Sequence, residues 1–90
     1  MLEPIYTKQF RKELKLAQKR HMKIDKLGVV MEMIINEHPL PPERKNHSLQ
    51  GEWKGYDECH IQGDWVLIYE IDLADRSVTF HRTGSHSDLF

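Results

Sequence analysis

One segment, from Trp65 to Ile71, constrains the fold of this 90-residue chain more than any other. Its sequence, WVLIYEI, is apolar at nearly every position. Turn-forming residues stand on both sides of it, Gln62-Gly63 before and Asp72 to Arg76 after. A short apolar run between two turns predicts a strand that is buried on both faces. The segment is therefore expected to be the central strand of a sheet.

The segments that flank this strand predict one further strand on each side. From Tyr56 to Ile61 the residues alternate, so that Glu58 and His60 point away from the side that Cys59 and Ile61 share. Ser77 to Thr83 forms the last strand before Gly84 releases a short tail. Strands joined by such short turns predict an antiparallel meander.

The first part of the chain has helical periodicity instead. Glu3 to Tyr6 is expected to form a short first strand, and Thr7 is a suitable N-cap for a helix that runs to about Arg20. A second helix is expected from Ile24 to Ile35, and it must end by His38 because a proline follows. The polar segment up to Gly55 then reads as a loop.

These elements predict an α+β fold for a single domain that spans residues 1–90. Its two N-terminal helices would pack on one face of a twisted antiparallel sheet. The other face would stay open, where a substrate could lie. A chain of 90 residues is long enough for one compact core and shows no linker that would separate two.

Composition excludes several classes of protein. The longest apolar runs are far shorter than the ~20 residues of a membrane span, and the first ten residues lack the pattern of a signal peptide. The single cysteine, Cys59, excludes an internal disulfide and a zinc ribbon. A cytoplasmic location is therefore expected, with no membrane partner.

The net charge of −1 hides a division along the chain. Residues 1–27 hold eight Lys or Arg against three acids, and residues 28–90 hold five against eleven. The first helix presents a basic stripe formed by Lys8, Lys12, Lys15 and Lys19. Such a stripe is typical of a polyanion-binding face, although an ordinary solvated helix face explains it about as well.

Histidine is the residue type that points to chemistry. Four of the six histidines, His47, His60, His81 and His86, lie where a core role is not expected, and Asp64 follows His60 across a turn, roughly 5 to 8 Å away. RNA cleavage without a metal needs a base, an acid and a cation beside the phosphate. Histidine serves both proton roles near neutral pH, and Arg82 could supply the cation.

Each of these residues also has an ordinary structural interpretation. A histidine in a loop is usually a solvated surface group, and Asp64 is a common turn residue. Arg82 could simply pair with Asp57 or Glu70. Spacing alone leaves a histidine-based nuclease site as one hypothesis among others.

Several motifs together resemble a known family. They are HxLQGxWKGY from His47 to Tyr56, then His60, the pair Asp64-Trp65, the triplet Leu67 to Tyr69, and RTGxHxxLF from Arg82 to Phe90. The chain resembles the YafQ branch of the RelE-type bacterial toxins, and the likeness extends into the first helix at Lys15 to His21.

This resemblance implies a fold similar to microbial ribonucleases and a ribosome-dependent messenger RNA endoribonuclease. It implies cleavage in the ribosomal A site without a metal or other cofactor, leaving a 2′,3′-cyclic phosphate and a 5′-hydroxyl. It also implies neutralisation by a cognate antitoxin, contact between the basic first helix and ribosomal RNA, and no DNA binding by the toxin alone. Such toxins are usually distinctly basic, and the slightly acidic charge of this chain departs from that pattern.

The resemblance implies roles for individual residues. His86 would be the general acid and His47 or His60 the general base, while Asp64 would orient a histidine or share the base role. Phe90 would stack on a nucleobase, Arg82 would hold the scissile phosphate, and Lys54 is a further candidate for phosphate contact.

Two alternatives from other classes remain open at this point. One is a metal-binding or metal-sensing module, in which some of His47, His60, Asp64, His81 and His86 ligate zinc or nickel, although no pair has the tight spacing common in such sites. The other is a regulatory module that binds an antitoxin-like partner without catalysis.

Overall fold

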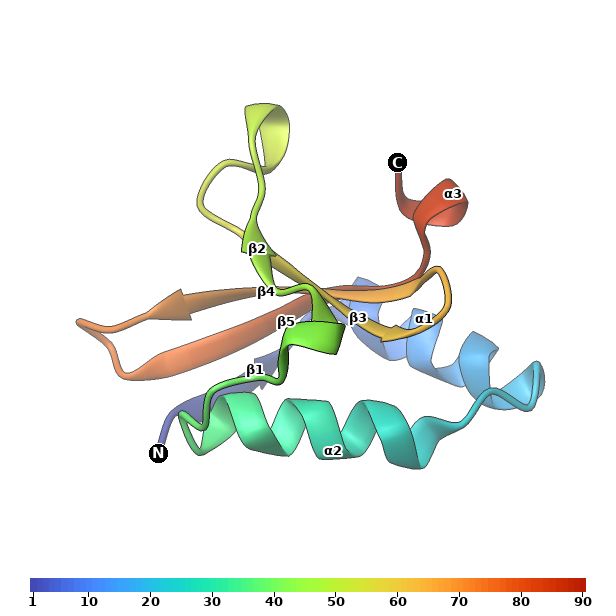
Figure 1. The fold of residues 1–90 in the computed structure, drawn as a ribbon, viewed down its shortest axis with the longest axis horizontal. Helices are drawn as coiled ribbons and strands as arrows, with labels where there is room; N and C mark the ends of the chain where they lie inside the picture. The colour runs from blue at the N-terminus through green and yellow to red at the C-terminus, as the bar shows by residue number, and fades with distance from the viewer.

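A computed structural model describes all 90 residues, with the helices and strands shown in Figure 1. In chain order the elements are β1 (Glu3–Tyr6), α1 (Lys8–Lys19), α2 (Ile24–Ile35), η1 (Pro42–Arg44), β2 (His47–Ser48), η2 (Gly51–Trp53), β3 (Asp57–Gln62), β4 (Trp65–Asp72), β5 (Ser77–Ser85) and α3 (His86–Leu89). The fold class is α+β, as the sequence predicts.

The sheet has five strands in the order β1-β5-β4-β3-β2, which places β4 at its centre. The expected antiparallel meander is present in β3, β4 and β5. The sheet as a whole is mixed rather than antiparallel, because β1 pairs with β5 in parallel. Two helices and the rest of the sheet separate these strands in the chain, so no hairpin fixes their relative direction.

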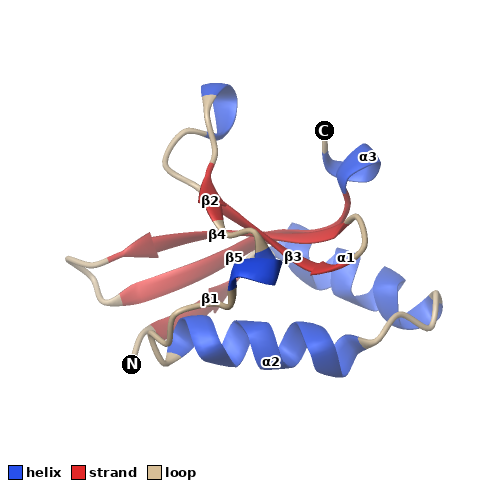
Figure 2. Cartoon of the chain, in the orientation of Figure 1, coloured by secondary structure: helices blue, strands red, loops and turns tan.

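Both long helices lie on one side of the sheet (Figure 2). α1 begins where predicted, since the Thr7 hydroxyl accepts a hydrogen bond from the backbone N–H of Phe10 at 3.0 Å. α2 ends at Ile35, before a residue with positive φ, Glu37, and before Pro39. One core of 13 buried residues joins the helices to the sheet. It includes Phe10 and Ala17 of α1 and Leu27, Val30 and Ile34 of α2.

β4 is buried on both faces, as its composition predicts. Its second face is partly covered rather than open. Val66 and Ile68 form a small apolar cluster with Leu89, and Leu49, Trp53 and Tyr56 pack against it. The cover comes from α3 and from the segment around η2, and together with β2 and η1 these short elements are absent from the sequence prediction.

No helix is long and apolar enough to cross a membrane.

Candidate active site

A polar pocket lies at the end of the sheet where β2, β3, the β3–β4 turn and α3 meet. No hydrophobic residue lines it. Its lining is formed by Lys45, His47, Glu58, His60, Gly63, Asp64 and His86, and we call it the histidine pocket. Three of the histidines that the sequence singles out therefore converge here, from segments as far apart as residues 47 and 86.

Glu58 is the centre of this pocket. Its side chain is buried, yet three imidazoles surround its Oε1 atom. The Nε2 atoms of His86, His60 and His47 lie 2.7, 3.5 and 3.9 Å from it. The other carboxylate oxygen, Oε2, is buried without a hydrogen-bond partner. Glu58 has no Lys or Arg in ion-pair contact, so the three histidines are its only ion-pair partners.

Local structure explains why these side chains converge. His47 of β2 lies directly opposite Glu58 of β3 in the antiparallel register, so the two side chains share one face. His60 lies two residues further along β3 and therefore points the same way. The register shifts after His60, which turns the end of β3 toward Gly63, a glycine with φ of 58°.

The fourth segment of the pocket is fixed by the start of α3. The Ser85 hydroxyl caps this short helix by accepting a hydrogen bond from the N–H of Asp88. The backbone N–H of His86 donates to the carbonyl of Asp64 at 3.0 Å. These two contacts hold the His86 ring above Glu58, and the His60 and His86 ring centroids lie 5.8 Å apart.

Hydrogen bonds also fix which ring nitrogens face Glu58. Nδ1 of His47 lies 2.8 Å from the carbonyl of Lys45, and Nδ1 of His60 lies 3.4 Å from that of Gly63. A carbonyl can only accept, so Nδ1 carries the proton in both rings. When either ring is neutral, its Nε2 is an acceptor that faces the pocket. About half of the His47 side chain, 51%, is exposed to solvent.

Asp64 lines the pocket, as predicted, but its carboxylate does not orient a histidine. Its backbone carbonyl holds His86, and its carboxylate makes no hydrogen bond or ion pair with any histidine. The carboxylate that contacts the histidines is that of Glu58. In the sequence Glu58 shares a strand face with His60, but no motif singles it out. An acid two residues before a histidine on one strand was the signal that could have found it.

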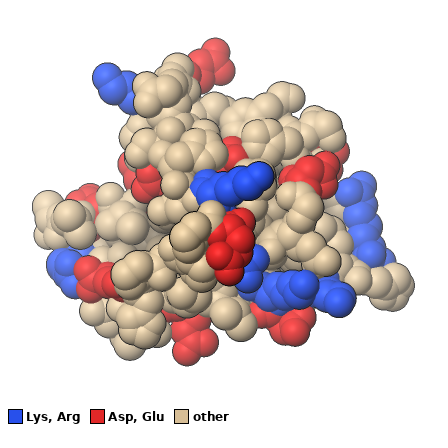
Figure 3. Space-filling view, viewed as in Figure 1, with Lys and Arg blue, Asp and Glu red and all other residues tan.

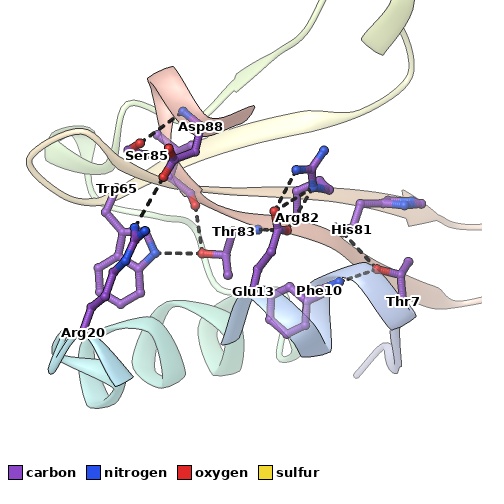
Figure 4. A network of polar contacts seen from close by, with 11 residues as sticks. Thr7, Phe10, Glu13, Arg20, Trp65, His81, Arg82, Thr83, Ser85 and Asp88 are labelled. Carbon is purple, nitrogen blue, oxygen red and sulfur yellow. Dashed lines mark hydrogen bonds and ion pairs between the residues drawn. The ribbon is translucent and has the colours of Figure 1, made fainter. Parts of the chain in front are cut away.

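Arg82 does not line the histidine pocket. Its guanidinium forms a two-pronged ion pair with Glu13 of α1, with Arg82 Nη2 and Nε at 2.7 and 2.9 Å from the carboxylate (Figure 4). Glu13 also accepts from the backbone N–H of Thr83. The hydrogen bonds from Arg82 to Glu13 raise the pKa of Arg82 above its usual value. Arg82 pairs with neither Asp57 nor Glu70, the partners considered from sequence.

A β-bulge explains the position of Arg82. Register pairs Ile68 with Arg82 and Tyr69 with Phe80, which leaves His81 as the extra residue of β5. Without the bulge, Arg82 would lie on the same buried face of β5 as Phe80. With the extra residue, Thr83 takes that buried position instead. The Thr83 hydroxyl accepts from the indole N–H of Trp65 at 2.8 Å, as Figure 4 shows. His81 lies away from the pocket, where it stacks on Tyr56 and contacts Glu70.

Phe90 and Lys45 complete the surroundings of the pocket. Phe90 is 53% exposed, and its ring centroid lies 5.1 Å from that of His86 and 5.6 Å from that of Trp53. Lys45 is the cation that lines the pocket, and no sequence motif points to it. Lys54, which the sequence suggested, is exposed at the end of η2 and is not part of the lining.

One further group is excluded from the chemistry. Burial raises the pKa of the Cys59 thiol to about 12. Cys59 points into the main core, on the opposite side of β3 from Glu58 and His60. It therefore offers neither a nucleophile nor a metal ligand to the pocket.

Comparison with known proteins assigns the chain to a family. A family model described as bacterial toxin of type II toxin-antitoxin system, YafQ, matches residues 2–90. The chain belongs to the YafQ family of bacterial toxins. The YafQ protein of Escherichia coli K12, named an mRNA interferase toxin, is 49% identical over 86 residues, which cover 94% of this chain and 91% of that protein.

Solved structures of YafQ proteins have the same fold. The crystal structure of YafQ from E. coli BL21(DE3) matches with a TM-score of 0.93 at 44% identity, covering 100% of this chain and 99% of that one. YafQ in the E. coli DinJ-YafQ complex matches with a TM-score of 0.91 at 45% identity and the same coverage. A metal-bound toxin from Helicobacter pylori matches with a TM-score of 0.94 at 37% identity, with 100% of both chains covered. The family and fold expected from the sequence motifs are confirmed.

Proposed function

We propose that this protein is the toxin of a toxin-antitoxin pair and that it cleaves messenger RNA in the ribosomal A site by histidine-based acid-base chemistry, without a catalytic metal. The YafQ protein of E. coli K12 is named an mRNA interferase toxin, and an E. coli YafQ is solved in complex with DinJ. The observation that carries the proposal is the geometry of the histidine pocket. Three imidazoles face one buried carboxylate in an open polar hollow, with an exposed aromatic ring at its margin.

In the proposed reaction His47 is the general base. Its Nδ1–H is held by the Lys45 carbonyl, so the lone pair of Nε2 faces the pocket and can accept the proton of a ribose 2′-hydroxyl. The 2′-oxygen then forms a bond to phosphorus as the bond from phosphorus to the 5′-oxygen breaks. The products are a 2′,3′-cyclic phosphate and a 5′-hydroxyl. His60 is less exposed than His47, at 24% against 51%, and a proton on its Nε2 would stabilise charge on the phosphate.

His86 is the proposed general acid. Its Nε2 lies 2.7 Å from Glu58, and an ionised carboxylate can only accept, so this nitrogen carries a proton in the resting pocket. To protonate the leaving 5′-oxygen, the exposed ring has to present that proton or the one on Nδ1 to the substrate. Glu58 is a positioning residue in this scheme, because its buried side chain cannot touch RNA.

Two further contacts with RNA complete the proposal. Lys45 faces the pocket and would neutralise the scissile phosphate, which is the role that the sequence suggested for Arg82. Phe90 would stack on a base beside that phosphate. Asp64, at the rim, would contact the substrate rather than orient a histidine.

Docking on the ribosome is proposed to use the basic stripe of α1. Lys8, Lys12, Lys15 and Lys19 are all exposed. On the face drawn in Figure 3, basic side chains gather toward the right, where Figure 1 places α1 and the start of α2, with acidic ones scattered among them. Ribosomal RNA is the polyanion that fits this stripe. A cytoplasmic location follows from the substrate.

A cleavage assay on translating ribosomes tests the proposal. Wild-type protein should cut mRNA at A-site codons, and the cut should persist when the toxin has been treated with EDTA and magnesium is restored for the ribosomes. His86→Gln should cleave at least about 10²-fold more slowly and still bind the cognate antitoxin. His81→Gln is the matched control, since this histidine lies outside the pocket, and it should cleave normally. Cleavage by His86→Gln at the wild-type rate would contradict the assignment.

A further inference from the structure

We propose that the histidine pocket also binds one divalent transition-metal ion through Glu58, His60 and His86, and that the bound metal switches RNA cleavage off. The metal site is argued from the geometry, burial and donor chemistry of the pocket and does not depend on the proposed function. The inhibitory part rests on the function proposed above, because it supposes that the same atoms move protons during cleavage.

The spacing of the three donors suits a metal ion. One ligand atom from each of Glu58, His60 and His86 lies within 4.8 Å of the other two. Nε2 of His86 and of His60 lie 2.7 and 3.5 Å from Oε1 of Glu58. Neighbouring ligands of a tetrahedral zinc are roughly 3.3 Å apart, given zinc–nitrogen and zinc–oxygen bonds of about 2.0 to 2.2 Å. Small side-chain rotations would bring all three donors to that spacing.

The state of Glu58 is the second, independent observation. Its carboxylate is buried, and Oε2 lacks a hydrogen-bond partner. Its ion-pair partners are three histidines and no permanent cation. A buried carboxylate with one unpaired oxygen is strongly stabilised by a divalent cation. A metal ion and the protons on Nε2 of His60 and His86 would therefore compete for the space beside Oε1 of Glu58.

The donor set also selects the kind of metal. Two imidazoles and one carboxylate suit zinc, copper or nickel, whereas magnesium prefers oxygen ligands and its own water. The hollow is open to solvent, so a water molecule can take a fourth position. The two rings can bind metal through Nε2 while Nδ1 of His60 keeps its hydrogen bond to the Gly63 carbonyl, which fixes the orientation of that ligand.

Metal binding would occupy the groups that cleavage needs. His86 could no longer deliver a proton from Nε2, and His60 could no longer face the phosphate. Binding would also release protons, because a ligating imidazole must be neutral at the bonding nitrogen.

Calorimetric titration of the full chain with Zn²⁺ tests the site without any RNA. The wild type should bind one ion, and Mg²⁺ should give no comparable heat. Glu58→Gln and His86→Gln should each weaken zinc binding by at least about 10- to 100-fold, the loss typical of a mere supporting residue. His81→Gln is the matched control, because His81 belongs to another cluster, and its affinity should equal that of the wild type. Equal affinities for wild type and Glu58→Gln, or a matching loss in His81→Gln, would overturn the proposal.

Two further measurements distinguish a failure of the metal-site proposal from a failure of the proposed function. Circular dichroism establishes that each variant is folded, and zinc should raise the melting temperature of the wild type more than that of Glu58→Gln. In the cleavage assay, zinc at saturation should slow cutting at least about tenfold, with recovery on chelation. Cleavage that is unaffected by saturating zinc would overturn the inhibitory part alone. Zinc binding by a protein that never cuts RNA would overturn the proposed function and leave the metal site standing.

Discussion

Nε2 of His86 lies 2.7 Å from Oε1 of Glu58, although 28 residues separate the two in the chain. This contact joins α3 to β3 and places a proton donor over a carboxylate that solvent does not reach. His47 and His60 face the same oxygen, so all three imidazole rings are arranged around the buried carboxylate of Glu58. The chemistry proposed for this toxin depends on that charge.

Glu58→Gln is the most direct test of this organisation. The amide keeps the shape of the side chain but removes its negative charge, so His86 loses the partner that holds its proton. We expect single-turnover cleavage to fall by about 10²-fold or more, with a shift of the pH–rate profile. The melting temperature should hold or rise, since a buried charge has been removed.

Glu58→Asp is the companion variant for this experiment. It restores the charge on a shorter side chain, so it should recover part of the activity and move the pH profile back toward that of the wild type. A Glu58→Gln protein that cleaves normally would show that the carboxylate serves packing only.

Lys45 is expected to supply the positive charge beside the scissile phosphate. The residue has a positive φ of 48°, a conformation that asparagine adopts more readily than most side chains, so Lys45→Asn removes the charge with little backbone strain. Cleavage should fall by roughly 10- to 100-fold, and Lys45→Arg should retain most of it. Rate measurements at several salt concentrations should show a weaker salt dependence for Lys45→Asn. Equal rates for all three proteins would exclude the contact.

Phe90→Leu tests the stacking role of the C-terminal ring. Base–aromatic stacking contributes about 1 to 3 kcal/mol, so the variant should lose roughly 5- to 150-fold in kcat/KM, mainly through KM. Folding should be little affected, because Phe90 is 53% exposed. Phe90→Trp keeps a stacking surface and should remain close to the wild type. A loss confined to kcat would instead indicate that the ring positions His86, whose centroid lies 5.1 Å away.

Periodicity predicted the regular elements because local physics decides them. Thr7 caps α1, the proline after His38 limits α2, and the apolar run from Trp65 forms the central strand. The parallel direction of β1 could not be predicted from local sequence, because β1 pairs with β5 at the other end of the chain. β2 was missed because two residues carry no periodicity, yet it is β2 that places His47 opposite Glu58.

Residue types and family motifs predicted part of the site. His47, His60, Asp64 and His86 do line one pocket. Glu58 and Lys45 were missed because their importance comes from burial and from a turn, neither of which spacing reveals. Arg82 was assigned to the phosphate because the local sequence predicts neither the bulge at His81 nor the ion pair with Glu13 of α1.

The ion pair between Arg82 and Glu13 leads to the last prediction, which separates a structural arginine from one that binds phosphate. Arg82→Met removes the charge-assisted hydrogen bonds that join β5 to α1, so we expect a loss of about 1 to 3 kcal/mol in the free energy of unfolding. Glu13→Gln weakens the same contact from the other side and should also be less stable than the wild type. At a temperature where both variants are fully folded by circular dichroism, both should cleave RNA within about threefold of the wild-type rate. Arg82 holds the phosphate after all if Arg82→Met alone is slower by about 10²-fold, because removing Glu13 would free the guanidinium rather than delete it.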